Sequence, residues 1–281
     1  MVYRLGMTAL GMMLGATTMV HAERVTIEPS KDNTLIQTTD GGFSNGAGLG
    51  IFAGRVGQNG GGLRRRAVIA FDVAAAVPSG AIVTSASLTM TCVQTNAGPR
   101  VVTLHRLEAD WGEGTSFGFG GFGAASTPGD ATWLHTFYPD LFWAEPGGDF
   151  ADDASTQTTV NSIATYTWES TAATVEDVQG WLDDPAQNYG WIAVGDESTQ
   201  MTVKRFASRE WTVPAERPLL TLDYEMPKGT PGDLDGSGTV GPADLAILLA
   251  AWGQCEECPE DLDGDGIVGP ADLAILLANW G

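Results

Sequence analysis

The chain has 281 residues, 43% of them hydrophobic, which is enough apolar material for one large domain or for a large domain with a small one. Its formal net charge is −21, and this acidity excludes a phosphate-binding surface spread over the whole protein. We therefore expect no nucleic-acid partner. Three cysteines are too few for a small fold built on disulfides.

Residues 1–22 are typical of an export signal. Arg4 provides the positive start, residues 5–20 are mostly apolar, and the stretch ends in Val-His-Ala, which resembles a small-x-small cleavage site. A membrane anchor is the alternative, but the apolar run is short for a span and no stop-transfer charges follow it. We therefore predict a secreted, extracellular or cell-surface protein without a transmembrane span, whose mature chain starts near Glu23. Disulfides and calcium are expected in that setting.

Residues 23–226 predict a mostly β module. Apolar residues recur at alternate positions over 66–73 and again over 82–92, as in strands. Clusters of Gly, Pro, Asn and Ser separate further short apolar runs at 101–107, 191–194, 201–206 and 219–224. We therefore predict an all-β, jelly-roll-like sandwich of two sheets.

Three segments interrupt the predicted strands. Residues 41–62 contain ten glycines and are expected to form a loop. Residues 111–143 hold nine of the 24 aromatic residues, which either stack on sugar rings or pack a long inserted loop. A helix is expected to start at a capping box of Thr174 and Asp177 and to end before Pro185.

Several short motifs occur in a fixed order along this module: Lys31–Leu35, Ser44–Gly48, Arg65–Asp72, Leu104–Leu107, Asp110–Gly114, Val178–Leu182 and Arg205–Glu210. The ordered set resembles the DNRLRE family of secreted β-sandwich modules, over roughly residues 24–226. Some members of that family are carbohydrate-binding modules for acidic polysaccharides such as alginate or heparosan. The resemblance therefore implies a β-sandwich, and possible polysaccharide binding.

Positive charge is scarce in this module, since 13 basic and 25 acidic residues give residues 23–231 a net charge of −12. A local cluster of arginines suits bidentate recognition of carboxylates. Internal salt bridges to Glu210, Asp72 or other acids are the alternative for the arginines, and a structural role is the alternative for the histidine. The ligand candidates are Arg64, Arg65, Arg66, His105, Trp111, Arg205 and Arg209, with the last two near the arginine run if the strands pair as in the family.

The sequence holds no strong catalytic motif. Only His105 and His135 remain after signal cleavage, and neither Gly-x-Ser-x-Gly nor His-Glu-x-x-His is present. Asp110 and Glu113 are candidate paired carboxylates for glycoside hydrolysis, but such acids more often cap turns or bind a structural cation. We therefore assign no catalytic residue.

Residues 233–253 recur as residues 261–281, 28 positions later. Each copy contains Asp-x-Asp-x-(Ser/Asp)-Gly and a carboxylate at position 12, which is the calcium-loop pattern of EF-hands. Calcium prefers carboxylate and carbonyl oxygens, so we predict two calcium sites. The predicted ligands are Asp233, Asp235, Ser237, the carbonyl of Thr239 and Asp244 in the first loop, and Asp261, Asp263, Asp265, the carbonyl of Ile267 and Asp272 in the second.

Each loop leads into a short helix that starts at a proline. In the first copy an apolar face of Leu245, Leu248, Leu249 and Trp252 follows, and the second copy repeats it. We expect the two faces to bury each other. Because residues 232–281 carry ten acids and no Lys or Arg, we also expect calcium binding and folding to be coupled.

Residues 233–281, after a Pro/Gly linker at 227–232, resemble a type I dockerin domain. The family is a small all-α calcium-binding domain of two F-hand loop–helix repeats, and it binds cohesin modules, usually in polysaccharide-degrading systems. The resemblance therefore implies a cohesin-like partner. Loop positions 10 and 11, which often contact cohesin in that family, are Pro242-Ala243 and Pro270-Ala271 instead of the common hydroxylated pair.

The cysteines have different expected roles. Cys255 and Cys258 lie between the repeats and are expected to form a small disulfide, because the βαβ setting of a redox site and the further ligands of a zinc site are missing. Cys92 shares the parity of apolar residues on its strand and is expected to be a buried free thiol.

The sequence thus predicts a secreted, non-catalytic polysaccharide-binding or surface module that a calcium-dependent dockerin domain attaches to a partner. One alternative is a polysaccharide-degrading enzyme, either a lyase or a glycoside hydrolase. The other is a structural or adhesion protein without a sugar ligand. Exposed aromatic rings beside Arg64–Arg66 favour the first hypothesis, a catalytic dyad in a cleft favours the second, and complete burial of the rings favours the third.

Overall fold

The computed structural model describes residues 22–226, 229–255 and 258–281. These residues form two compact units, one within Ala22–Pro227 and the other within Lys228–Gly281. The predicted export signal lies outside the described residues except for Ala22. Among the helices of the described residues, none has the combined length and apolar character that a membrane span requires.

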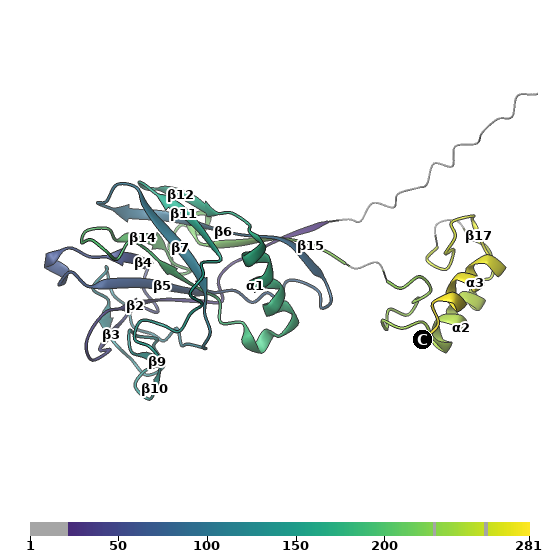
Figure 1. The fold of residues 1–281 in the computed structure, drawn as a ribbon, viewed down its shortest axis with the longest axis horizontal. Helices are drawn as coiled ribbons and strands as arrows, with labels where there is room; N and C mark the ends of the chain where they lie inside the picture. The colour runs from purple at the N-terminus through teal and green to yellow at the C-terminus, as the bar shows by residue number, and fades with distance from the viewer. Residues whose placement is uncertain (1–21, 227–228, 256–257) are drawn as a thin grey trace, which may run out of the picture. The chain divides into compact units, whose positions relative to one another are not determined.

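The first unit is mostly β and is built on one curled antiparallel sheet (Figure 1). Its eleven strands are β1 (Glu23–Ile27), β2 (Lys31–Ile36), β4 (Gly50–Arg55), β5 (Arg64–Ala70), β6 (Ile82–Thr95), β7 (Arg100–Arg106), β11 (Thr156–Val160), β12 (Ala164–Trp168), β13 (Trp191–Val194), β14 (Lys204–Ala207) and β15 (Leu219–Glu225). The path through the sheet is β1-β15-β6-β14-β4-β5-β13-β7-β11, while β12 pairs with β6 and β2 pairs with β5.

Short elements decorate this sheet. Strands β3 (Phe43–Ser44) and β8 (Ala124–Ala125) pair with each other, as do β9 (His135–Phe137) and β10 (Leu141–Phe142). Three 3₁₀ turns lie at Gln58–Gly60, Pro185–Gln187 and Pro214–Glu216.

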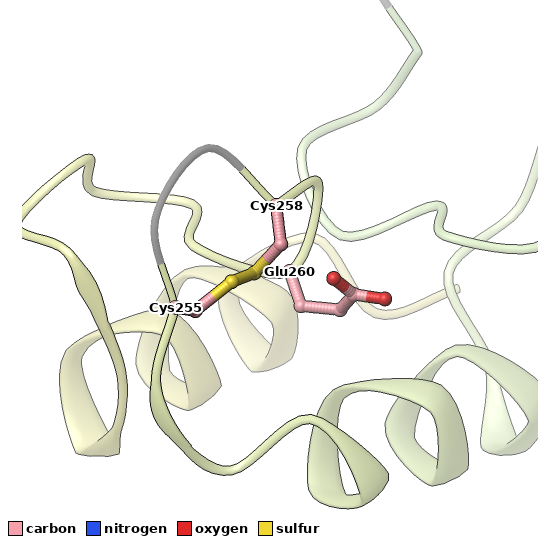
Figure 2. A group of neighbouring side chains, drawn as sticks. All are labelled: Cys255, Cys258 and Glu260. Atoms are coloured by element: carbon pink, nitrogen blue, oxygen red, sulfur yellow. A yellow bond between two sulfur atoms is a disulfide. The ribbon is translucent and has the colours of Figure 1, made fainter.

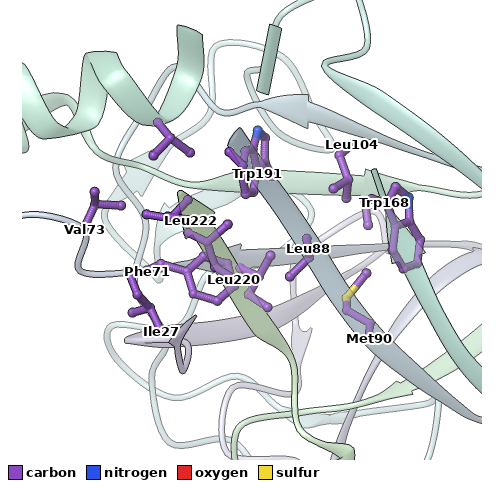
Figure 3. Close-up of a cluster of buried hydrophobic side chains, with 14 of the residues drawn as sticks. Ile27, Phe71, Val73, Leu88, Met90, Leu104, Trp168, Trp191, Leu220 and Leu222 are labelled. Atoms are coloured by element: carbon purple, nitrogen blue, oxygen red, sulfur yellow. The ribbon is translucent and has the colours of Figure 1, made fainter. Parts of the chain in front are cut away.

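The main core lies inside the curl of the sheet. On β15, Leu220 and Leu222 are buried and face Leu88 and Ala86 across the ladder to β6, because alternate residues of a strand share one face. Burial of each leucine side chain contributes about 1.5–3 kcal/mol. Figure 3 shows these leucines gathered with Trp168, Trp191 and other apolar side chains of the cluster.

A second core lies on the other face of β5. Ala67 and Ile69 belong to the main core, whereas Val68 and Ala70 pack into this second cluster. β5 is therefore buried on both faces. The second cluster also contains three tryptophans of the long loop after β7, namely Trp111, Trp133 and Trp143.

Strand β4 lies inside the glycine-rich stretch that the sequence predicts to be a loop, so that expectation is wrong. A side chain at Gly50 would place its Cβ 2.5 Å from Arg205 Nε and 2.9 Å from the carbonyl oxygen of Phe206. The glycine thus permits the close pairing of β4 with β14. Residues Gly50 to Ala53 are all buried, which removes the polar alternation that usually reveals a strand.

Helix α1 (Ala172–Asp183) starts earlier than the sequence predicts. Its N-cap is Thr171, whose hydroxyl accepts from Thr174 N at 3.1 Å, while Thr171 N donates to the Thr174 hydroxyl at 2.9 Å. Asp177, the expected capping partner, is instead a buried residue within the helix. Its carboxylate accepts hydrogen bonds from Ser155 at 2.5 Å and Trp191 at 2.7 Å, and so ties α1 to the sheet.

The second unit contains two nearly identical helices, α2 (Pro242–Ala250) and α3 (Pro270–Ala278). It is not purely helical, because β16 (Gly253–Gln254) and β17 (Ile267–Val268) form a short antiparallel ladder between the repeats. Its small core includes four fully buried apolar side chains, those of Val240, Leu248, Val268 and Leu276.

Candidate functional site

The first acidic loop of the second unit brings three predicted calcium ligands together. The side chains of Asp233, Asp235 and Asp244 offer ligand atoms within 4.8 Å of one another. The Ser237 hydroxyl donates to the carbonyl oxygen of Thr239 at 3.1 Å, so these two predicted ligands lie in contact with each other. Carboxylate, hydroxyl and carbonyl oxygens form a donor set that suits a hard cation.

The second loop gathers a different trio. Asp261, Asp263 and Asp265 offer ligand atoms within 4.8 Å of one another. Burial is the main cause that raises the pKa of Asp263, and the neighbouring carboxylates of Asp265, Asp272 and Asp261 raise it further. The amide of Ile267, whose carbonyl is the remaining predicted ligand, donates to Asp265 Oδ1 at 2.8 Å.

The carboxylates at position 12 have a second role as helix caps. Asp244 Oδ2 accepts from Gly241 N at 2.7 Å, and its Oδ1 accepts from the amides of Leu234 and Asp235. These hydrogen bonds, above all that from the amide of Asp235, lower the pKa of Asp244. Asp272 repeats the arrangement at α3; burial raises its pKa, but the backbone hydrogen bonds outweigh this and lower the pKa overall. Both carboxylates are thus kept ionised, which favours cation binding.

The sharp turn at position 6 of each loop requires glycine. Gly238 and Gly266 have φ values of +87° and +86°, a region that disfavours residues with a Cβ. The two loops therefore share one backbone conformation at the position where the calcium-loop pattern requires it.

An apolar surface is duplicated on the second unit. Leu249 is 50% exposed and Leu277 is 53% exposed, while Trp252 and Trp280 are 47% and 44% exposed. The expectation that the helices bury their whole apolar faces on each other is therefore wrong. Only Leu248 and Leu276 of these faces are fully buried, because two helices of nine residues form too small a core to cover the wider stripe.

Cys255 and Cys258 are joined by a disulfide, with Glu260 beside it (Figure 2). Because the two sulfurs are bonded to each other, they do not provide the thiolates that a zinc site needs. Cys92 is a buried free thiol, as the sequence predicts.

The arginine run is largely used internally. Arg66 Nε lies 2.8 Å from Glu197 Oε1, and Arg64 Nε lies 3.4 Å from the other oxygen of the same carboxylate. Arg65 is buried, donates to the carbonyl oxygens of Gly121 and Arg64, and has its pKa lowered to about 10 by burial. The alternative of internal salt bridges therefore holds for Arg64 and Arg66, whose partner acid is Glu197.

Two other ligand candidates, Trp111 and His105, make hydrogen bonds within the protein. Trp111 is completely buried and donates from Nε1 to the carbonyl oxygen of Tyr189 at 2.9 Å, so its ring is not available to stack on a sugar. Both ring nitrogens of His105 lie at 2.9 Å from protein oxygens, those of Ala151 and Thr103.

Arg205 lines a pocket of about 440 Å³ on the first unit. The pocket contains aromatic rings that face solvent, since Phe119 is 89% exposed and Phe122 is 64% exposed. The guanidinium of Arg205 lies 5.6 Å from the ring centroid of Phe52, and burial lowers its pKa. Gln94 and Asn96 add polar side chains to the wall. Phe119 and Phe122 belong to the aromatic stretch noted in the sequence, whereas Phe52 lies in the segment that the sequence predicts to be a loop.

The candidate carboxylates for hydrolysis have separate cationic partners. Asp110 accepts from Lys31 Nζ at 2.6 Å, and Glu113 accepts from Arg209 Nη1 at 2.7 Å. Arg209, the remaining ligand candidate, is thus engaged in an ion pair.

No protein-family model matches the chain, and no curated protein matches it. The resemblances of the two units to known families therefore rest on their motifs.

Proposed function

We propose that this chain is a secreted, non-catalytic polysaccharide-binding module that a calcium-dependent, dockerin-like unit attaches to a cohesin-like partner. The observation that carries the proposal is the duplication in the second unit. Each repeat combines an acidic oxygen-rich loop with an exposed leucine–tryptophan pair. A surface that merely covers a core has no need to present the same apolar pair twice.

Calcium has a defined role in this proposal. Asp233, Asp235 and Asp244 hold one ion with Ser237 and the Thr239 carbonyl, and the second repeat holds another with the equivalent set of Asp261, Asp263, Asp265, Asp272 and the Ile267 carbonyl. The ions neutralise carboxylates that repel one another and join each loop to the start of its helix. Folding of the second unit is therefore coupled to calcium.

The partner surface consists of Leu249, Trp252, Leu277 and Trp280. Large exposed apolar side chains of this kind mark interaction sites in soluble proteins, and tryptophan is prominent among residues that dominate binding energy. Because the repeats are nearly identical, a partner has two equivalent patches to choose from.

The first unit provides the polysaccharide-binding half of the proposal, as a jelly-roll-like β-sandwich of the DNRLRE type. Its candidate site is the pocket at Arg205, where Phe119 and Phe122 offer apolar faces to sugar rings. Arg205 suits the carboxylate of an acidic polysaccharide such as alginate or heparosan.

Two binding assays on the purified mature chain test the proposal. The first measures binding to immobilised recombinant type I cohesin modules in calcium and in EGTA, with the double variant Leu249→Ala/Leu277→Ala. We expect calcium-dependent binding that the variant loses. Binding to no cohesin of the panel contradicts the assigned partner.

The second assay measures retardation in gels that contain alginate or heparosan. We expect retardation by the full chain and by a chain that lacks residues 232–281, and its loss in Arg205→Gln. Arg24→Gln is the matched control, because Arg24 is exposed on β1 and does not line the pocket. The absence of retardation favours a structural or adhesion protein, and release of new sugar ends from either polymer indicates an enzyme.

A further inference from the structure

Three carboxylates of the first unit meet far from each other in sequence. Asp32 lies on β2, Glu113 lies in the long loop after β7, and Glu210 lies in the turn after β14. Their side chains offer ligand atoms within 4.8 Å of one another. Three of the ordered sequence motifs, Lys31–Leu35, Asp110–Gly114 and Arg205–Glu210, therefore converge on one place.

A buried carboxylate oxygen at this place lacks a hydrogen-bond donor. Asp32 is completely buried, and its Oδ2 accepts from Arg209 N at 2.7 Å, but no described residue donates to its Oδ1. Glu210 Oε2 is likewise buried without a donor from the described residues. Since buried polar atoms are nearly always satisfied in folded proteins, two such oxygens in one cluster indicate a missing positive partner.

The charges of the cluster do not balance. Three carboxylates face one guanidinium, that of Arg209, which lies 2.7 Å from Glu113 Oε2 and 3.6 Å from Glu210 Oε1. Fully ionised, the group sums to −2. Burial raises the pKa of both Asp32 and Glu210, and the neighbouring carboxylates raise it further. A single divalent cation would neutralise the remaining charge.

The cluster is built into a firm frame. Asp32 N donates to Glu113 Oε1 at 2.9 Å, and the Asn33 side chain donates to the carbonyl oxygen of Glu113 at 2.8 Å. On the other side, the Ser208 hydroxyl holds the turn of Glu210 by donating to Gly48 at 2.7 Å and accepting from Glu210 N at 3.2 Å. Glu113, Arg209 and Glu210 remain partly exposed, which leaves an entry path from solvent.

We propose that Asp32, Glu113 and Glu210 form a cation site of the first unit, which binds a divalent ion that prefers oxygen ligands, calcium foremost. Neither histidine nor free cysteine belongs to the group, and a purely carboxylate donor set selects hard cations over zinc or copper. The bound ion ties β2 to the loop of Glu113 and to the turn of Glu210. This site is separate from the two acidic loops of the second unit and does not depend on the function proposed above.

Calcium titration calorimetry on the full mature chain tests the site, after the second unit has been disabled by Asp235→Ala and Asp263→Ala. We expect that this chain still binds one calcium ion. Added Asp32→Asn or Glu210→Gln should weaken the remaining binding about tenfold or more. Asp110→Asn is the matched control: it removes a nearby carboxylate that pairs with Lys31 and is outside the cluster, so it should leave the affinity unchanged.

Thermal unfolding of the same chains, measured with and without calcium, provides a second test in case a variant folds poorly. Calcium should raise the unfolding temperature of the first unit in the disabled chain and in Asp110→Asn, but not in Glu210→Gln. The Glu210 side chain is partly exposed, so its substitution is expected to be tolerated by the fold. The proposal is overturned if the disabled chain binds neither calcium, magnesium nor manganese at millimolar concentration. It is equally overturned if Glu210→Gln binds calcium as well as its parent, which would indicate that the ion binds elsewhere.

Discussion

Lys204 is a buried lysine whose charge is satisfied by backbone carbonyls. Its ammonium donates to the oxygens of Ala97, Gly98 and Asn161 at 3.0, 2.8 and 3.0 Å. Burial lowers its pKa, so the three hydrogen bonds must compensate for the loss of water around the charge. The residue thereby connects β14 to two loops that are distant in sequence.

Substitution Lys204→Met keeps most of the side-chain volume but removes the donor. We expect the first unit to lose about 1–3 kcal/mol of unfolding free energy, because the hydrogen bonds from a charged donor to three carbonyl oxygens are lost. Urea denaturation measures the loss, with Arg24→Met as a control on an exposed cation of the same sheet. Equal effects of the two substitutions would contradict the assigned role.

Asp223 provides a pH-dependent contact between the first and last strands of the sheet. The Arg24 guanidinium donates to its two oxygens at 2.6 and 2.8 Å, and this hydrogen bonding lowers the pKa of Asp223 below its ordinary value of 3.8. Because the pKa of Asp223 is lower in the folded protein than in the unfolded chain, the pair stabilises the fold at pH values above the ordinary pKa. The contribution is lost as the pH falls through the lowered pKa.

Arg24→Gln should therefore raise the pKa of Asp223, which an NMR titration of the carboxyl carbon measures directly. The effect on stability is expected to be small, because the pair is exposed to solvent. The neighbouring hydrogen bond from Tyr224 to Glu23 at 2.7 Å serves as an internal control for the pairing of β1 with β15. An unchanged pKa of Asp223 in a variant that keeps this hydrogen bond would contradict the explanation.

At the scale of whole elements, the sequence predicts strands whose apolar residues recur at alternate positions, but it misses β4. β15 and β6 follow the alternation of buried and exposed residues, and both are found near their predicted bounds. β4 is missed because it lies in a glycine-rich stretch and contains Gly50, whose role depends on Arg205 and Phe206 in a distant strand. Burial by partners that are distant in sequence leaves no local signal.

The candidate sites show the same limit. The acidic loops are local, so their spacing alone predicts which carboxylates approach one another. The two trios differ in one member: the first includes Asp244 at position 12, whereas the second includes Asp265 at position 5. The carboxylate cluster of the first unit is not local, since 81 positions separate Asp32 from Glu113. Its motifs are visible in the sequence, but their convergence follows from the curl of the sheet.

Adjacent leucines on α2 distinguish the core from the proposed partner surface. Leu248 is fully buried, whereas Leu249 is half exposed on the same helix. We expect Leu248→Ala to cost about 2–5 kcal/mol and to weaken folding of the second unit even in calcium, because the cavity lies in a very small core. Leu249→Ala should leave folding unchanged within about 0.5 kcal/mol. Thermal unfolding followed by circular dichroism compares the two, and similar losses in both would contradict the assignment of the exposed face.

Across the whole molecule, acidity is distributed unevenly between the units. Residues 232–281 contain ten of the 35 acidic residues and no Lys or Arg. Among the described residues of this unit, the core holds four fully buried apolar side chains, compared with a large cluster in the first unit. Carboxylate repulsion therefore opposes a weak hydrophobic contribution in the second unit, whereas the first unit has a core sufficient for independent stability.

Removal of calcium should accordingly unfold one unit and spare the sheet of the other. Hydrogen exchange followed by mass spectrometry, with and without EGTA, measures this on the full chain, since each peptide reports on its own segment. We expect EGTA to abolish protection in α2 and α3, because ten uncompensated acids then outweigh the small core, while peptides of β6 and β15 keep their slow exchange. Magnesium in place of calcium should restore little protection, because it requires a tighter octahedral geometry. Persistent protection of α2 and α3 in EGTA would show that their folding is independent of the metal, and a joint loss in β6 would show that the two units do not fold independently.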